Sequence, residues 1–219
     1  MQRAAPDLIA ITGDQVDDCA GDIEPFSRAF STLAAPLGVF AIPGNHDVYA
    51  GWREVRAGLQ VMGSLLLVND ARPLERAGEA FWIAGTGDPA GVGRPYGAGG
   101  EAAPDIDRTL SRIPAGAFTI ALAHNPALWP DLATRGGPLT LSGHTHYGQF
   151  SIPALGWSLA SAFLDLAMGA HRLGRSLLYI SPGTNYWGLP LRIGALPEVT
   201  VLTLRPAGLD AAPSIFARV

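Results

Sequence analysis

Histidine, aspartate and asparagine side chains gather at four points of this sequence, each directly after a short apolar run. The four points are Gly13-Asp14, Gly44-Asn45-His46-Asp47, His124 and Gly143-His144-Thr145-His146. Four of the five histidines of the chain lie in these motifs. Histidines scattered through a core or a surface would not be expected to concentrate in this way, so the sequence predicts a metal site.

The donor groups indicate which metals the site would take. Imidazole, carboxylate and amide oxygen without thiolate suit divalent ions such as Mn, Fe or Zn in a non-structural site. A carboxylate such as that of Asp14 can bridge two cations, and paired metals about 3.5–4 Å apart suit in-line displacement at phosphorus. The glycines before Asp14, Asn45 and His144 allow tight turns and close backbone approach at these positions.

The elements that must position these residues follow an alternating pattern. Strand-length apolar runs occur at residues 8–12, 39–42, 81–84, 118–123, 139–142, 177–181 and 199–204. Helix-like stretches occur at residues 25–35, 52–62, 105–113 and 127–135. Strands that alternate with helices predict an α/β fold, in which ligands bind beyond the carboxyl ends of the strands. No helix pattern separates the last two runs, so we expect them to pair as neighbours.

Length and composition favour a single globular catalytic domain over residues 1–219. The chain has 48% hydrophobic and 16% charged residues, and its net charge of −4 gives no reason to expect nucleic acid as a partner. Cys19 is the single cysteine, which excludes an internal disulfide. No apolar run reaches bilayer length, so we expect the chain to be soluble as given; the sequence leaves localisation and oligomeric state open.

The four motifs together resemble the ordered signature of the calcineurin-like metallophosphoesterases. The first motif extends to Gly13-Asp14-Gln15-Val16-Asp17, and the others follow in the family's order. Residues 141–149 and 181–204 further resemble a bacterial subgroup that includes membrane-associated phosphodiesterases. The resemblance implies a four-layer α/β/β/α sandwich with two central sheets flanked by helices.

The resemblance also implies two divalent metal ions and their ligands. The implied metal ligands are Asp14, Asn45, His124, His144 and His146. Asp14 would bridge both ions; Asn45, His124 and His144 would complete the second site, and His146 would belong to the first. The nucleophile would be a metal-bound hydroxide that attacks the phosphorus in line.

Three further residues receive roles from the same resemblance. His46 would lie over the scissile phosphate and either stabilise the transition state or protonate the leaving group. Asp47 would orient His46, and both residues would be catalytic. Asp17 would hold other ligands in place without touching a metal.

One motif of the family is missing. The signature begins with Asp-x-His at the end of an earlier strand, and only six residues precede Asp7. The first metal site is therefore incomplete, with Asp14 and His146 as its ligands from this chain. We interpret the sequence as N-terminally truncated, without the first strand, and expect a version extended upstream to be more soluble and more active.

The predicted function is metal-dependent hydrolysis of a small phosphorylated substrate by a phosphodiesterase or pyrophosphatase. The subgroup resemblance points to a nucleotide-linked or lipid-linked substrate and to peripheral membrane association. The alternative is a non-enzymatic module that binds phosphate or a single metal. Three features stay open. Asp88 could approach the site or form a turn, and Arg192 could bind substrate or form a surface ion pair. Residues 157–168 could be a core helix, a packed loop or a lipid-facing lip.

Overall fold

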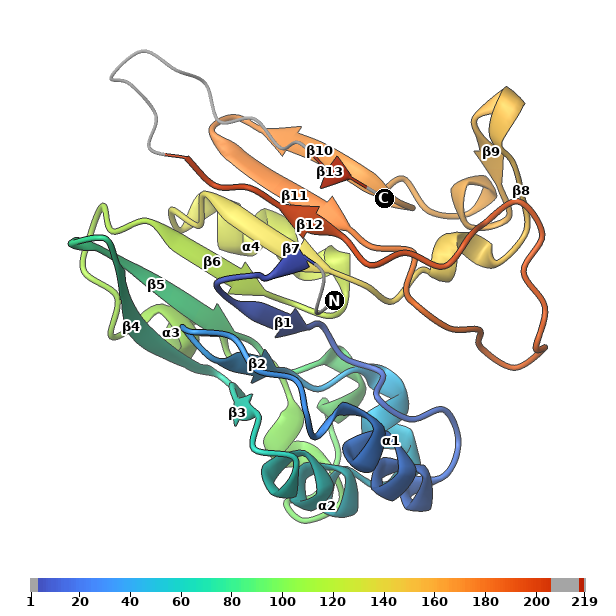
Figure 1. Cartoon of the computed structure of the whole chain (residues 1–219), viewed down its shortest axis with the longest axis horizontal. Coiled ribbons are helices and arrows are strands. Elements are labelled where there is room, and N and C mark those ends of the chain that lie inside the picture. The colour runs from blue at the N-terminus through green and yellow to red at the C-terminus, as the bar shows by residue number, and fades with distance from the viewer. Residues whose placement is uncertain (1–3, 206–216, 219) are drawn as a thin grey trace.

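Two β-sheets form the centre of the molecule in the computed structural model, which describes residues 4–205 and 217–218 (Figure 1). The smaller sheet is parallel and contains, in order, β1 (Ile9–Ile11), β2 (Val39–Ala41) and β3 (Leu65–Leu66). The larger sheet has the order β10 (Gly169–Leu173), β11 (Ser176–Ile180), β7 (Leu139–Ser142), β6 (Thr119–Leu122), β5 (Glu79–Gly85) and β4 (Asp70–Arg76). Its four inner strands are parallel, whereas β10 and β4 run antiparallel at the two edges.

Helices cover the outer face of each sheet. The residues of α1 (Ile23–Phe30) and α2 (Asn45–Val61) pack with the smaller sheet, and those of α3 (Ile106–Leu110) and α4 (Trp129–Thr134) pack with the larger one (Figure 1). Two short pairs, β8 (Ser151–Ile152) with β9 (Trp157–Ser158) and β12 (Val201–Leu202) with β13 (Ala217–Arg218), complete the strands. None of the helices in the described ranges is long and apolar enough to cross a membrane.

Side-chain alternation along the buried strands explains the layers. Phe40 and Ile42 belong to the core between the two sheets, whereas Ala41, between them in sequence, packs under α1 and α2. In the same way Leu122 faces the other sheet, and Ala121 packs with residues around α3 and α4. Because successive strand residues point to opposite faces, each sheet has two buried faces. The predicted α/β/β/α arrangement is therefore confirmed.

Several predicted elements need correction. β12 pairs with β13 and not with β11, whose neighbours are β10 and β7, so the expected pairing of the last two strands is wrong. The helix expected at 52–62 begins at Asn45 and is kinked at Gly51, where φ is +133°. Residues 157–168 are not a core helix: they contain β9 and a short 3₁₀ turn, and Phe163 is 81% exposed.

The topology brings the sequence motifs to one edge of the molecule. β1 and β2 end just before Asp14 and Asn45, and β6 and β7 end just before His124 and His144. Within each sheet these strands are parallel, so their carboxyl ends lie on the same side. The fold thus assembles a site from residues more than a hundred positions apart.

Candidate metal centre

Four side chains from four strand ends meet in one cluster. His124 Nε2 lies 3.1 Å from Asp14 Oδ2 and 3.0 Å from Asn45 Oδ1. His144 Nδ1 lies 2.8 Å from the same Asn45 oxygen, and the two imidazole rings are 5.2 Å apart between centroids. The structure therefore brings together Asp14, Asn45, His124 and His144 as the sequence predicted.

Glycines make this approach possible. A Cβ on Gly13, where φ is +96°, would lie 2.4 Å from Nδ1 of His124, and a Cβ on Gly44 would lie 2.1 Å from Oδ1 of Asp14. Either contact is far too short for a real side chain, so only glycine fits beside the cluster. Asp14, His144 and His146 themselves have positive φ, at +54°, +72° and +50°, a backbone conformation that is uncommon for residues other than glycine.

The orientation of His124 is fixed by its second ring nitrogen. Nδ1 lies 2.7 Å from the carbonyl oxygen of Thr12, so it donates its hydrogen to that oxygen and leaves Nε2 facing Asp14 and Asn45. Burial disfavours the charged imidazole, but the Asp14 carboxylate overcomes this and raises the pKa of His124 to about 9. The Asp14 carboxylate therefore favours a protonated Nε2 that faces the Asp14 and Asn45 oxygens.

The pKa values of His144 and His146 are lowered, in contrast to that of His124. Burial lowers the pKa of His144 to about 4 and that of His146 to about 4. Both imidazoles are then neutral near pH 7 and each carries a lone pair on one ring nitrogen. Neutral imidazole is the form that ligates a divalent metal.

A buried, unpartnered polar atom indicates that the cluster fits a cation. His146 Nδ1 is buried and has no hydrogen-bond partner among the described residues, whereas Asp14 Oδ2 has His124 Nε2 as its ion-pair partner at 3.1 Å. Buried polar atoms are normally paired, so an unpaired imidazole nitrogen in this position fits a cation ligand. Asn45 Oδ1 contacts both the His124 and the His144 imidazole, and Asp14 Oδ2 faces His124, so carboxylate, amide oxygen and imidazole together form a donor set suited to a divalent ion without thiolate ligands.

His46 lies next to this cluster in the first turn of α2. Its backbone N–H donates to Asp14 Oδ1 at 2.9 Å, which ties the helix start to the first motif. Its Nδ1 faces the carbonyl oxygen of Asp17 at 3.1 Å and Oδ1 of Asp17 at 3.2 Å. The ring is also 5.9 Å from the Trp187 ring, centroid to centroid. Asp17 therefore positions His46 through its backbone carbonyl oxygen, and its carboxylate lies within ion-pair distance of the same nitrogen.

Asp17, Asp18 and His46 together form a group of three side chains that could ligate a metal ion. The ligand atoms of Asp17, Asp18 and His46 all lie within 4.8 Å of one another. The Asp18 side chain is 88% exposed, however, and its Oδ1 is 3.9 Å from Nδ1 of His46. We therefore assign this group to the positioning of His46.

The prediction that Asp47 orients His46 does not agree with the structure, in which the Asp47 carboxylate binds backbone N–H groups. The Asp47 carboxylate is fully buried and accepts four backbone N–H hydrogen bonds, from Gly44, Asp14, Gln15 and Val16, at 2.7–3.2 Å. Its two oxygens are thus occupied by the backbone of the first two motifs. Burial raises the pKa of Asp47 to about 7 and the charge of Asp14 adds to this, while the backbone donors favour the carboxylate. Asp47 locks two ligand-bearing loops together.

Asp88 belongs to the neighbourhood of the site, which sequence reasoning left open. Its side chain is 1% exposed, Oδ1 accepts from the Ala90 N–H at 2.9 Å, and Oδ2 has no described hydrogen-bond partner. Burial raises the pKa of Asp88, and its charge raises that of His124. It follows β5, a parallel neighbour of β6, so the strand-end rule applied to this strand would have found it.

Arg192 forms no ion pair with the described residues, so the surface ion pair is not the role of this side chain. Its guanidinium donates to the backbone carbonyl oxygens of Asn185, Ala195 and Pro182 at 2.6–3.1 Å. It therefore shapes the loop after β11, and its charge contributes to lowering the pKa of His146.

A comparison with protein families agrees with this site. The calcineurin-like phosphoesterase family matches residues 1–148, which include Asp14, Asn45, His124, His144 and His146. The chain therefore belongs to the calcineurin-like phosphoesterases, a family of metal-dependent phosphoester hydrolases.

Individual relatives and a solved structure support the same assignment. The chain is 32% identical to an uncharacterized metallophosphoesterase of Helicobacter pylori. The match covers 91% of this chain and 51% of that relative. It is 32% identical to phosphodiesterase YaeI of Escherichia coli, over 91% of this chain and 70% of YaeI. Sulfate thiohydrolase SoxB of Thermus thermophilus shares the fold, with a TM-score of 0.56 and 18% identity over 79% of this chain and 33% of SoxB. The chain thus spans about half the length of the first curated relatives it matches.

Proposed function

We propose that this chain hydrolyses phosphate diesters or pyrophosphates with divalent cations bound at the cluster. The observation that carries the proposal is the convergence of Asp14, Asn45, His124 and His144, with Asn45 Oδ1 within 3.0 Å of both imidazoles. These four residues would hold one cation, and Asp14 with His146 would hold part of a second site. When bound, such cations of the Mn, Fe or Zn type supply Lewis-acid activation of water and of the phosphoryl group.

The residues of the chain itself have separate tasks in this proposal. His46 is the candidate general acid, because Asp17 fixes Nδ1 and leaves Nε2 to donate a proton to the leaving oxygen or to stabilise its charge. The backbone N–H of His46 holds Asp14 in its ligating orientation. Asp47 keeps the loops of Asp14 and Asn45 at a fixed separation.

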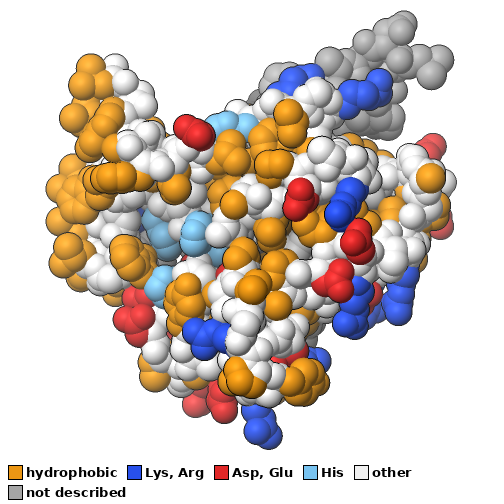
Figure 2. Space-filling view, turned by 180° about the vertical axis from the view of Figure 1, so that it is seen from behind, with side chains coloured by type: hydrophobic (Ala, Val, Ile, Leu, Met, Phe, Trp, Pro, Cys, Tyr) orange, Lys and Arg blue, Asp and Glu red, His pale blue; other side chains and the backbone are white. Residues whose placement is uncertain are grey.

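The surface beside the site favours an apolar, lipid-linked substrate. Two segments, residues 150–168 and 182–199, form what we call the apolar rim. Its exposed large hydrophobic side chains are Ile152, Leu155, Trp157, Leu159, Phe163, Leu164, Met168, Tyr186, Trp187, Leu189, Leu191, Ile193, Leu196 and Val199. Figure 2 shows hydrophobic side chains massed beside the hollow in which the histidines are visible. An apolar surface this extensive is uncommon on a protein that contacts only water.

The apolar rim is fastened to the catalytic loops. Trp187 contacts His46, Gly188 N–H donates to Asp17 Oδ2 at 3.3 Å, and Gln149 donates to the Trp187 carbonyl at 2.8 Å. The rim carries few charges: Asp165 in the first segment, and in the second Arg192 and Glu198, both of which are hydrogen-bonded within the fold. This supports a lipid-linked substrate and peripheral contact with a membrane.

Metal dependence with a diester substrate tests the proposed function. We expect the chain to hydrolyse bis(p-nitrophenyl) phosphate after Mn²⁺ addition, and to lose this activity when the metal is removed with a chelator and regain it on readdition. Release of p-nitrophenol measures the rate directly. Retention of metal with no turnover on any diester or pyrophosphate would contradict the proposal and favour a non-enzymatic binding module.

Removal of the charge beside His46 gives a finer prediction. Asp17→Asn is expected to lower kcat by about tenfold, because it removes the carboxylate charge 3.2 Å from His46 Nδ1 while the backbone carbonyl oxygen of Asp17 still accepts from that nitrogen. KM for bis(p-nitrophenyl) phosphate should change little, since Asp17 does not contact the cluster ligands. A large rise in KM with unchanged kcat would show that Asp17 acts in binding instead.

The apolar rim can be tested apart from the chemistry. Phe163→Ser combined with Leu155→Ser, at side chains 81% and 73% exposed, is expected to weaken binding to phospholipid vesicles and lower turnover of a lipid-linked diester. Hydrolysis of the water-soluble diester should be unchanged, because neither residue contacts the cluster. Cosedimentation with vesicles and the two rates give the comparison, and equal loss on both substrates would contradict a lipid-facing role.

A further inference from the structure

A second hollow lies away from the metal centre, between the two sheets' outer strands. Its volume is about 480 Å³, and it is lined by the second half of α2, the segment from Ser64 to Arg72 that includes β3 and the start of β4, and α3. None of the lining residues belongs to the cluster. Arg56 follows His46 by ten positions along α2 and lies beyond the kink at Gly51, so the hollow is lined by the part of α2 that does not carry the site residues.

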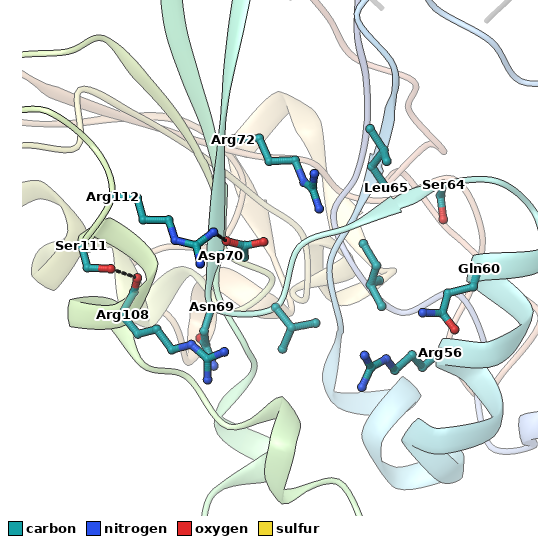
Figure 3. A pocket seen from close by; sticks show the side chains of 12 residues that line it. Arg56, Gln60, Ser64, Leu65, Asn69, Asp70, Arg72, Arg108, Ser111 and Arg112 are labelled. Atoms are coloured by element: carbon teal, nitrogen blue, oxygen red, sulfur yellow. Dashed lines mark hydrogen bonds and ion pairs between the residues drawn. The ribbon is translucent and has the colours of Figure 1, made fainter.

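Four of the fifteen arginines of the chain line this hollow, which we call the arginine pocket. They are Arg56 from α2, Arg72 from β4, and Arg108 and Arg112 from or directly after α3. Figure 3 shows Arg56 and Gln60 extending from one side, Arg72 from above and Arg108 from the opposite side, toward the space between them. Positive groups from three separate elements thus face one cavity in a chain whose net charge is −4.

The charge of the pocket is largely uncompensated. Arg112 is paired with Asp70, at 3.3 Å from Nη1 to Oδ1. Arg56, Arg72 and Arg108 have no acidic partner in the part of the chain that the structure describes, and Asp70 is the one acidic residue of the lining. Guanidinium groups that line one hollow repel one another, and an anion bound among them would offset that repulsion.

Two polar residues of the lining, Asn69 and Ser64, are held in place by hydrogen bonds to the backbone. Asn69 is 7% exposed; its Nδ2 donates to the Ala103 carbonyl at 2.7 Å, and its Oδ1 accepts from the Gly87 and Asp105 N–H groups at 2.9 Å each. Ser64 is buried and bonded to the Leu59 carbonyl. Leu66 and Val68 add a partly apolar surface to the wall. The pocket walls therefore hold their shape without the ligand.

We propose that the arginine pocket binds a small phosphorylated anion at a site separate from the catalytic cluster. Arginine presents paired N–H donors that match phosphate oxygens, and three guanidinium groups suit a ligand with more than one anionic oxygen. The volume is that of a small-molecule site and is too small for a folded partner. The inference does not depend on the hydrolytic activity, because no lining residue takes part in it.

Calorimetric titration of the full chain tests the proposal. Pyrophosphate and glycerol 3-phosphate are the probes, and they distinguish a free diphosphate from a phosphorylated organic molecule. A chelator is present so that the catalytic cluster holds no cation to attract phosphate. We expect one molecule of at least one probe to bind per chain, with an affinity that falls as salt is raised.

Matched variants locate the binding. Arg56→Gln with Arg72→Gln is expected to weaken binding at least about tenfold, since each removes charge-assisted hydrogen bonds to the anion. Arg53→Gln, on the same helix, exposed and outside the pocket lining, should leave the affinity unchanged. Thermal melting confirms folding of all variants. Absence of binding by either probe, or equal affinity in the Arg56/Arg72 variant and the wild type, would overturn the proposal.

Discussion

Asp47→Asn is expected to lower the free energy of unfolding by about 2–6 kcal/mol, although the substitution changes one atom. The two carboxylate oxygens each accept two backbone N–H groups, Oδ1 from Gln15 and Val16 and Oδ2 from Asp14 and Gly44. The amide nitrogen of Asn cannot accept, so two buried donors lose their partner at about 1–3 kcal/mol each. Because domains are stable by about 5–15 kcal/mol, this is a large share of the total.

Urea unfolding followed by circular dichroism measures the change. Asp131→Asn is the matched control, because Asp131 is exposed in the first turn of α4 and should have an effect within about 0.5 kcal/mol. A loss of less than about 1 kcal/mol for Asp47→Asn would mean that its four hydrogen bonds do not hold the two loops together.

Asp14→Asn should abolish most of the metal-dependent hydrolysis while leaving the chain folded. The substituted side chain keeps the shape and the oxygen that accepts from the His46 N–H, but it loses the charge shared by the cluster. Loss of several kcal/mol of transition-state stabilisation corresponds to at least about a hundredfold fall in kcat/KM. The structural reason is that Asp14 is the one carboxylate within ion-pair distance of His124 among the described residues.

Hydrolysis of bis(p-nitrophenyl) phosphate with Mn²⁺ gives the measurement, and Asp131→Asn again provides the control. A second readout is Mn²⁺ retained after gel filtration, which should fall together with the rate. Activity within about threefold of wild type would show that the charge of Asp14 is not required and that the ligand set is different.

The sequence predicts most of the fold because its buried strands are short apolar runs. Each of the seven predicted runs overlaps a strand of the structure, and the matched strands are β1, β2, β5, β6, β7, β11 and β12. The edge strand β4 was not predicted, since its sequence Asp70–Arg76 is largely polar and contains Pro73, which an edge position tolerates. The pairing of β12 with β13 was also missed, because strand partners at the surface are not encoded in local periodicity.

For the candidate site, the sequence predicts which residues come together but not which contacts each of them makes. Residue type and strand-end position suffice to group Asp14, Asn45, His124 and His144, because the fold sends parallel strand ends to one edge. The separate tasks of Asp17 and Asp47 could not be obtained in this way. Which carboxylate contacts His46 depends on side-chain direction after the turn at Gly13 and Gly44, and this is a property of the packed structure.

The exposed character of residues 157–168 was equally beyond reach of the sequence. An apolar run of this length can be a buried helix or a surface segment, and periodicity does not separate the two. The side-chain exposures decide it, with Phe163 at 81% and Leu164 at 44%.

Metal stoichiometry on the full chain tests the central claim most directly. The chain is loaded with Mn²⁺, gel-filtered and analysed for bound metal, alongside a folded Asn45→Ala/His144→Ala variant that lacks two of the four converging ligands. We predict at least one Mn²⁺ per wild-type chain and close to none in the variant. No retained metal in the wild type, or equal retention in both proteins, would contradict a metal centre at this cluster.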